Sequence, residues 1–168
     1  MDPVQRVSIV SRGLALGFTE ISPESDRSHQ TKSYLLHKIS ALLGGRAAEE
    51  LIFNDRTVGA GSDLEQASTI AYRMVNAFGM SELGPVAFVY KDKSDQFDNP
   101  FSASQYSEQM LSKIDQEIKG IIDACYTQSQ KILSENRQLL DEVVNILLKE
   151  ETIEQDRFNE IVTKYQAA

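Results

Sequence analysis

Apolar and polar residues follow two different periods along this chain, and the period changes near residue 31. Between Val4 and Thr19 the apolar residues alternate with polar or small ones around Gly13 and Gly17, as in a strand that buries one face. We expect two short strands there, paired as a hairpin. After the polar, proline-containing stretch at 22–28, the apolar residues recur at the spacing of an amphipathic helix.

The first predicted helix begins near Thr31 and is interrupted by Gly44 and Gly45. We therefore expect one kinked helix or two nearly continuous helices, with small residues that let another backbone approach closely. A second helix is predicted to begin near Ser62 and to end before Gly79, since glycine favours the position just after a helix.

The run at 84–90 predicts a short strand, and the polar stretch at 91–104 predicts a loop. Helical spacing returns over 105–133 and 136–149. A last helix is predicted after Thr152, because TIEQ has the form of a capping box.

These patterns predict a mainly α protein with a small N-terminal β-hairpin. A chain of 168 residues suits a single domain over 1–168. Within it we expect a hairpin and loop at 1–27, the helices of a candidate site at 28–90, and C-terminal helices at 91–168.

The charge balance narrows the possible partners. Lys and Arg number 17 and Asp and Glu number 25, giving a net charge of −8 with no basic block, so nucleic acid is excluded as an expected partner. Cys125 is the only cysteine, which excludes an internal disulfide and fits a reducing compartment. No apolar run reaches the roughly 20 residues of a membrane span, so we expect a soluble chain.

Asp63 is the candidate residue with two possible roles. Ser62 and Glu65 fit the S-x-x-E capping box, which would place Asp63 in the first helical turn, where the helix dipole favours its charge. Spacing alone favours this structural role over metal binding.

The other candidates have simpler structural interpretations. His29 and His37 do not share a helix face at ligand spacing, so each is expected to be an ordinary imidazole. Glu49 and Glu50 follow Arg46 at i,i+3 and i,i+4 spacing, which predicts surface ion pairs. Cys125 falls on an apolar stripe and is expected to be buried rather than nucleophilic.

Four strings, in order along the chain, resemble the peptidase domain of FtsH-type proteases. They are DPVQRVSIVSRGLALGFTEISPESDR, LLGGRAAEELIF, VGAGSDLEQASTIAYRMVNAFGMSELGPVAF and EETIEQDRF. The family consists of hexameric, membrane-anchored, ATP-dependent zinc metalloproteases. The similarity runs from Asp2 to about Val162, and its most specific parts are 44–53 and the block around Asp63.

The resemblance implies that Asp63 is the third ligand of a catalytic zinc ion, beside the two histidines of an HExxH helix. A carboxylate as third ligand leaves the fourth zinc position open for water, as catalysis requires. The sequence contains no HExxH, which in the family lies shortly before the segment matching DPVQRVSI. We therefore expect this chain alone to be inactive, either as a piece of a longer protein or as a non-catalytic helical interaction module, a pseudo-peptidase.

The resemblance also implies partners and further site residues. Glu49 and Glu50 would lie near the metal site and support it. A strand formed by Leu14, Ala15, Leu16, Gly17, Phe18 and Thr19 would offer its edge to an extended polypeptide substrate. In the parent protein it implies a hexamer on the cytoplasmic face of the bacterial inner membrane, or on an organelle membrane. The membrane anchor and the ATPase module that uses ATP and Mg²⁺ would both lie outside this chain.

Overall fold

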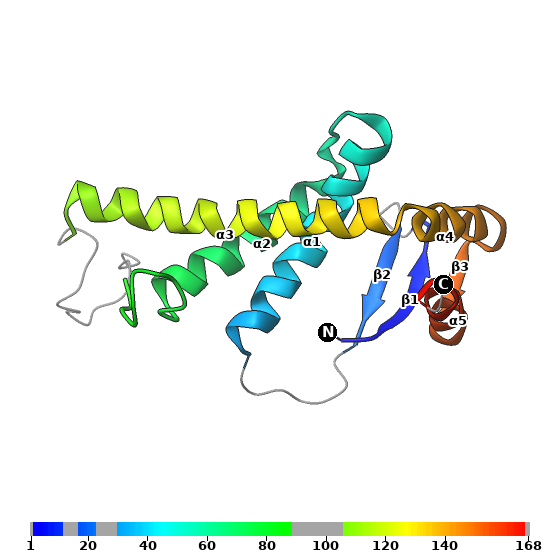
Figure 1. Cartoon of the computed structure of the whole chain (residues 1–168), viewed down its shortest axis with the longest axis horizontal. Coiled ribbons are helices and arrows are strands. Elements are labelled where there is room, and N and C mark those ends of the chain that lie inside the picture. The colour runs from blue at the N-terminus through cyan, green and yellow to red at the C-terminus, as the bar shows by residue number, and fades with distance from the viewer. Residues whose placement is uncertain (1, 12–16, 23–29, 89–105, 167–168) are drawn as a thin grey trace. The chain divides into compact units, whose positions relative to one another are not determined.

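The computed structural model describes residues 2–11, 17–22, 30–88 and 106–166 (Figure 1). The chain divides into two compact units, one made of Met1–Gln30 with Leu133–Ala168 and the other of Thr31–Ile132. Helices dominate and the strands form one small sheet, so the prediction of a mainly α fold with an N-terminal hairpin is confirmed.

The central unit begins with α1, Lys32–Phe53, whose N-terminus is capped by Thr31. The Thr31 hydroxyl accepts a hydrogen bond from the Tyr34 amide at 3.2 Å. The helix runs through Gly44 and Gly45 without a break, and a Cβ atom added at either glycine would meet nothing within 4 Å. The predicted interruption and close backbone approach are therefore not found among the described residues, because neighbouring leucine and alanine residues sustain the helix.

Two further helices complete this unit. A 3-10 turn, η1 (Val58–Ala60), leads into α2 (Gly61–Asn76), and α3 follows as Glu108–Glu135. Their shared core contains one apolar row from each helix: Leu35, Ile39, Leu43, Ala67, Ala71, Met74 and Cys125. Small alanines on α2 allow close packing against α1, since an interior must be filled to high density.

The far end of α2 stops as the sequence predicts, near Gly79. Gly79 has φ 58°, in the left-handed region that glycine adopts without strain. The Met80 amide donates to the Met74 carbonyl at 2.8 Å, and the Phe88 amide donates to the Asn76 carbonyl at 2.7 Å. The stretch 84–88 forms no strand, so that prediction is wrong for the described part of 84–90. The hydrogen bond of the Phe88 amide joins it to the end of α2 and not to a neighbouring strand.

The other unit contains a three-stranded sheet in the order β2-β1-β3. Strand β1 (Val4–Ser8) pairs antiparallel with β2 (Phe18–Ile21) and with β3 (Thr152–Glu154). Two helices accompany it, α4 (Arg137–Glu150) and α5 (Gln155–Gln166), and its core is formed by Leu147, Ile153 and Ile161.

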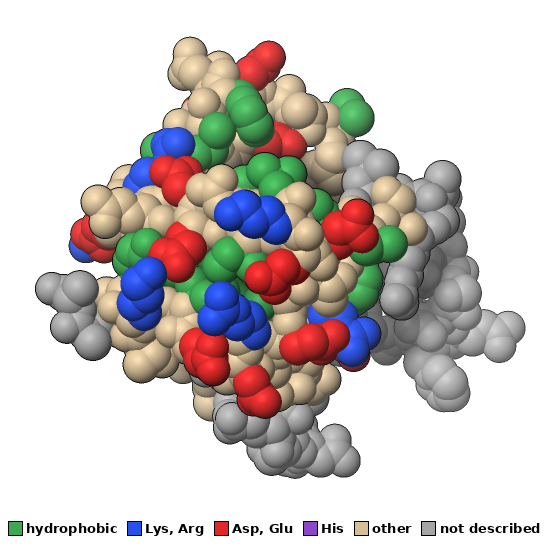
Figure 2. Space-filling view, turned by 90° about the vertical axis from the view of Figure 1, so that its right-hand side faces the viewer, with side chains coloured by type: hydrophobic (Ala, Val, Ile, Leu, Met, Phe, Trp, Pro, Cys, Tyr) green, Lys and Arg blue, Asp and Glu red, His purple; other side chains and the backbone are tan. Residues whose placement is uncertain are grey.

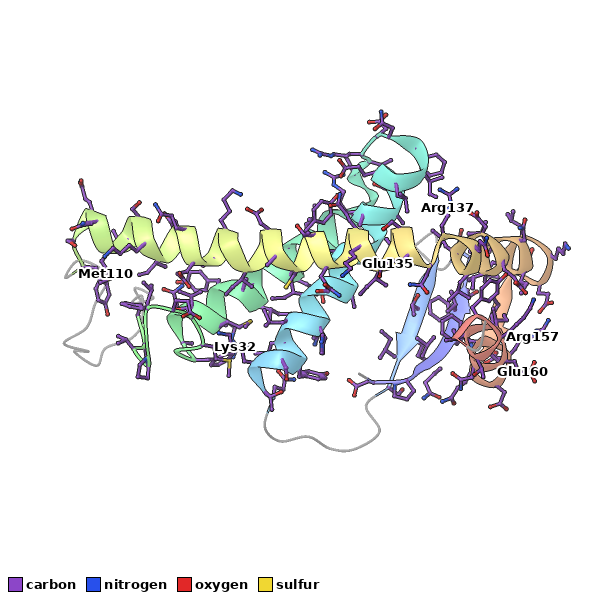
Figure 3. The ribbon with its side chains drawn as sticks, viewed as in Figure 1. Lys32, Met110, Glu135, Arg137, Arg157 and Glu160 are labelled. Carbon is purple, nitrogen blue, oxygen red and sulfur yellow. The ribbon has the colours of Figure 1, made fainter. Side chains whose placement is uncertain are left out.

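The predicted capping box at Thr152 is wrong, because Thr152 lies in strand β3. The Thr152 hydroxyl lies 2.9 Å from the Ser8 hydroxyl, and the Thr152 backbone pairs with Ser8 in the sheet. Because β1 uses these groups, α5 begins only at Gln155. On α5, Arg157 forms an ion pair with Glu160 at 3.1 Å (Figure 3).

The surface carries both charge signs in alternation. Figure 2 shows lysine and arginine side chains interspersed with aspartate and glutamate on one face, instead of a basic patch. No helix among the described residues has the length and apolar character needed to cross a membrane.

Candidate functional site

The connection between α1 and α2, residues 54–60, carries the candidate site. It leaves α1 through Asn54, which adopts the left-handed conformation at φ 50° and donates its amide to the Glu50 carbonyl at 3.1 Å. All residues from 51 to 59 are exposed, and Val58 is 97% exposed. Apolar burial in this connection is limited to Ala60, so polar contacts must define its path.

Thr57 is the centre of those polar contacts. Its hydroxyl accepts a hydrogen bond from the Gly59 amide at 3.1 Å and donates one to Glu49 Oε1 at 2.6 Å. Its amide donates to Glu49 Oε2 at 3.1 Å, and Arg46 Nη1 donates to its carbonyl at 3.0 Å. Side chains of α1 thus hold the residue that caps the turn before α2.

Glu50 forms a second connection beside the first. Its carboxylate accepts hydrogen bonds from Arg56 Nη2, at 3.1 Å, and from the Tyr126 hydroxyl of α3. Arg46 pairs with Glu49 at 3.9 Å as expected, whereas Glu50 takes Arg56 as its ion partner in place of the predicted i,i+4 pair. Both glutamates therefore connect elements and are more than simple surface ion pairs.

The electrostatics of the two glutamates follow from these contacts. The pKa of Glu49 lies below its usual value because of the Thr57 hydroxyl bond and then the Thr57 amide bond. The pKa of Glu50 is lowered by its hydrogen bonds with Tyr126 and then with Arg56. Burial and the bond to Glu50 raise the pKa of Tyr126. The charged Glu50 carboxylate and the neutral Tyr126 phenol therefore stabilise one another.

Asp63 lies in the first turn of α2, as predicted, and is half-buried. The helix begins at Gly61, with Ala60 as N-cap and no side-chain capping bond. The predicted Ser62–Glu65 capping box is therefore wrong. The 3-10 turn capped by Thr57 already directs the chain into the helix, so Ser62 falls inside it. The Asp63 charge still favours the positive end of the helix dipole.

The described residues do not form a zinc site by themselves. Asp63 supplies one carboxylate, and no group of three or more histidine, cysteine or acidic side chains with metal-binding geometry occurs in the described ranges. His37 is exposed on α1, and His29 lies outside the described residues. Glu49 and Glu50 hydrogen-bond to the connection and to α3, and no hydrogen bond joins either to Asp63 within the described chain. A catalytic zinc ion needs three protein ligands, so two must come from elsewhere.

The predicted substrate strand is described only in part. Phe18 and Thr19 lie in β2, at one edge of the sheet order, and Gly17 precedes the strand. A Cβ at Gly17 would lie 2.8 Å from the Ser8 carbonyl oxygen, so only glycine fits there. Leu14, Ala15 and Leu16 lie outside the described residues.

The Cys125 thiol is buried and contacts the Leu36 carbonyl oxygen at 3.5 Å, and burial raises its pKa, which disfavours the thiolate.

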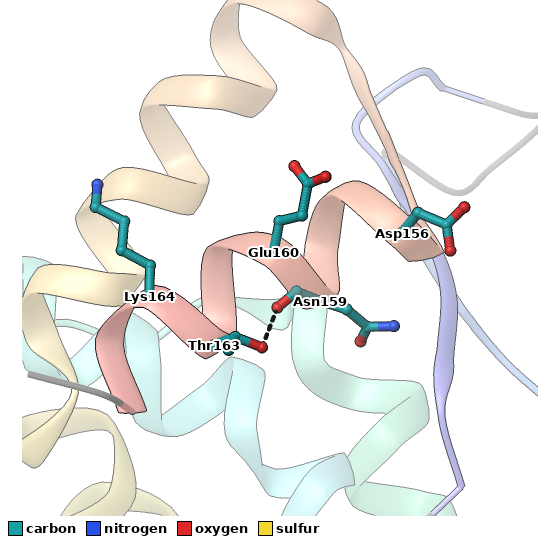
Figure 4. A pocket seen from close by; sticks show the side chains of 5 residues that line it. All are labelled: Asp156, Asn159, Glu160, Thr163 and Lys164. Carbon is teal, nitrogen blue, oxygen red and sulfur yellow. Dashed lines mark hydrogen bonds between the residues drawn. The ribbon is translucent and has the colours of Figure 1, made fainter.

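A shallow hollow on α5 is lined by Asp156, Asn159, Glu160, Thr163 and Lys164 (Figure 4). One helix supplies all five residues, and Thr163 donates to the Asn159 carbonyl of its own helix at 2.8 Å.

The sequence did not predict the roles of Arg56, Thr57 and Tyr126 at this site. Thr57 had a local signal, because a threonine before a glycine-rich turn is a typical cap. Tyr126 had none, since it lies 76 residues from its partner Glu50.

The profile of Peptidase family M41 matches residues 1–161 of the chain. The chain belongs to peptidase family M41. The predicted FtsH-type peptidase domain is thereby confirmed, and Asp63, Glu49 and Glu50 all fall inside the matched M41 region.

Several M41 relatives match nearly the whole chain. It is 43% identical over 163 residues to the ATP-dependent zinc metalloprotease FtsH of Thermobaculum terrenum, covering 96% of this chain and 25% of the relative. The proteins of the same name from Thermotoga maritima and Bacillus subtilis are each 44% identical, over 97% and 96% of this chain and 27% and 26% of theirs. The chain thus spans about a quarter of the length of these relatives.

Proposed function

We propose that this chain is part of an ATP-dependent zinc metalloendopeptidase that degrades misfolded and membrane proteins, and that Asp63 is the zinc ligand it supplies. The observation that carries the proposal is the position of Asp63. It stands in the first turn of α2, which has no side-chain capping bond, directly after a connection held to α1 by the hydrogen bonds between Thr57 and Glu49. Because neither Ser62 nor Glu65 forms a cap there, the capping-box explanation of this segment is lost.

A zinc ion bound with an open fourth position activates water and polarises a peptide carbonyl. In this chain, Asp63 would contribute one negatively charged ligand, held rigidly because the first turn of α2 is fixed. The two histidines and the glutamate of an HExxH helix are not in this sequence. The chain by itself therefore neither binds catalytic zinc tightly nor cleaves peptides.

The remaining parts of the proposal concern the parent protein. The relatives' names supply the ATP dependence, and an ATPase module using ATP and Mg²⁺ would act from outside this chain. We propose a hexamer anchored at the cytoplasmic face of a bacterial inner membrane, or at an organelle membrane. Polypeptide substrates would pair with the edge of β2, because main-chain pairing accepts many sequences.

The decisive experiment joins this chain to the HExxH segment of a close relative and compares Asp63→Asn with Glu65→Gln. Both substitutions remove one acidic charge from α2, and only Asp63 lies in the first turn, where the helix dipole favours its charge by about 0.3–1 kcal/mol. Bound zinc per chain and casein hydrolysis should be lost for Asp63→Asn and retained for Glu65→Gln, with unchanged circular dichroism. Equal zinc content in the two variants would reject Asp63 as a ligand.

The same measurements on the chain as it stands test its inactivity. Stoichiometric zinc together with chelator-sensitive casein hydrolysis by the purified chain would contradict the proposal. Absence of both, combined with full activity of the joined protein, would also argue against a pure interaction module.

A further inference from the structure

The connection that precedes Asp63 is held by two adjacent glutamates that bind two adjacent residues. Glu49 binds Thr57 through both carboxylate oxygens, and Glu50 binds Arg56. The apolar side chains beside them are largely exposed, with Phe53 at 72% exposure. Hydrogen bonds, rather than apolar packing, therefore fix the path of the connection.

Tyr126 links these contacts to the core. Its ring packs against the apolar cluster of α1, α2 and α3, which fixes the ring in place. Its hydroxyl donates to Glu50, the residue that holds Arg56. Because a hydrogen bond to a charged carboxylate is stronger than a neutral one, this contact can transmit the position of α3 to the connection.

We propose that Tyr126 is a positioning residue for Asp63, acting through Glu50 and Arg56. The phenol holds the Glu50 carboxylate in the orientation that binds Arg56, and Arg56 places Thr57 where it can bind Glu49 and cap the turn before α2. The role of Asp63 as a metal ligand rests on the proposed function. The contacts from α3 through Glu50 and Arg56 to the start of α2 are independent of that function.

The test is hydrogen–deuterium exchange on the full chain without added metal, comparing wild type with Tyr126→Phe. Loss of the hydroxyl should accelerate exchange of the amides at 57–63 about fivefold to tenfold, the range of a hydrogen bond worth about one kcal/mol or slightly more. Exchange at the far end of α2, around Met74 to Ala77, should stay unchanged. A general loosening of the unit would accelerate both ends together.

Tyr106→Phe is the matched control. It removes a tyrosine hydroxyl from the same unit, and the Tyr106 hydroxyl has no partner among the described residues. This variant should exchange like wild type at 57–63. Glu50→Gln should accelerate exchange at 57–63 at least as much as Tyr126→Phe, because one carboxylate oxygen accepts from Arg56 and the other from Tyr126, whereas an amide has only one acceptor oxygen.

Unchanged exchange at 57–63 in Tyr126→Phe would overturn the inference, as would equal acceleration at both ends of α2. In the protein joined to HExxH, Tyr126→Phe should weaken zinc affinity severalfold without abolishing binding. If Asp63→Asn leaves zinc content intact there, the ligand assignment fails while the exchange result still decides the positioning role.

Discussion

The two ends of α2 are fixed by opposite means. At its N-terminal end, side chains of Arg46, Glu49 and Thr57 hold an exposed connection through hydrogen bonds. At its C-terminal end, Met74, Val75 and Asn76 are almost fully buried. The hydrogen bonds that fix the chain after this end join main-chain amides to main-chain carbonyls.

The two ends of α2 therefore differ in how easily they open. The buried end contributes to the core and resists local opening, whereas the exposed end opens at lower cost because few apolar contacts must be broken. The candidate ligand, Asp63, lies at the end whose geometry depends on individual polar side chains. Such an end can be tuned by substitution without loss of the fold.

The largest effect is expected from Met74→Ala. Met74 is completely buried in the core between α1, α2 and α3, so removing its side chain should lower the free energy of unfolding by about 2–5 kcal/mol. Urea denaturation measures the change. Leu148→Ala is the control, since that leucine is 70% exposed and should change stability by about 0.5 kcal/mol or less. Similar losses in both variants would contradict the assignment of the core.

Gly79→Ala should have the next largest effect, about 1–2 kcal/mol. An alanine there must adopt φ 58°, and its Cβ would lie 3.1 Å from the Pro85 Cα atom. Gly84→Ala separates backbone strain from steric crowding. Gly84 also has positive φ, at 92°, but an added Cβ there would meet nothing within 4 Å. If thermal denaturation shows Gly84→Ala to be the more damaging change, backbone strain rather than crowding controls this end.

Thr57→Val keeps the shape of the side chain and removes the hydroxyl that caps η1. We expect the free energy of local opening to fall by about 0.5–2 kcal/mol, with the effect seen at residues 57–63. Thr127→Val serves as control, because the Thr127 hydroxyl donates to the Asp123 carbonyl of its own helix at 2.9 Å and, within the described residues, bonds to no second element. Residue-resolved hydrogen exchange checks the prediction. An equal effect at the two ends of α2 would remove the distinction between them.

The smallest expected effect is a change in pH dependence. The pKa of Glu49 is lowered in the folded chain, so its stabilising contribution is complete above its unfolded pKa of about 4.3. That contribution is lost as the pH falls through the lower folded value. Glu49→Gln should therefore flatten the acid side of the stability curve between about pH 5 and 3. An unchanged slope would show that the Thr57 contacts do not depend on the charge.

The sequence predicted features that depend on neighbouring residues and missed those that depend on distant ones. The end of α2 shortly before Gly79 was predictable, because glycine adopts the left-handed conformation there without strain. The start of α2, predicted near Ser62, lies at Gly61, but the predicted capping box was wrong, because the cap at Thr57 depends on Glu49 of another helix. Strand β3 was missed because Thr152–Glu154 is short and resembles a helix cap, and only its pairing with β1 makes it a strand.

For the candidate site, the family pattern identified Asp63, whereas the side chains that position it follow from the tertiary fold. The Tyr126–Glu50 contact is invisible to periodicity, since α3 must first pack on α1 before the two residues meet.

The pairing of β1 with β3 has a consequence for synthesis of the chain. Arg6 lies opposite Glu154, so β1 must wait for a strand 148 residues further along the chain before its sheet is complete. The helices within Thr31–Ile132 form a continuous segment and can pack while the remainder is still being translated. During that interval β1 keeps an unpaired edge, which makes the nascent chain most exposed to wrong strand pairing just before residues 152–154 emerge.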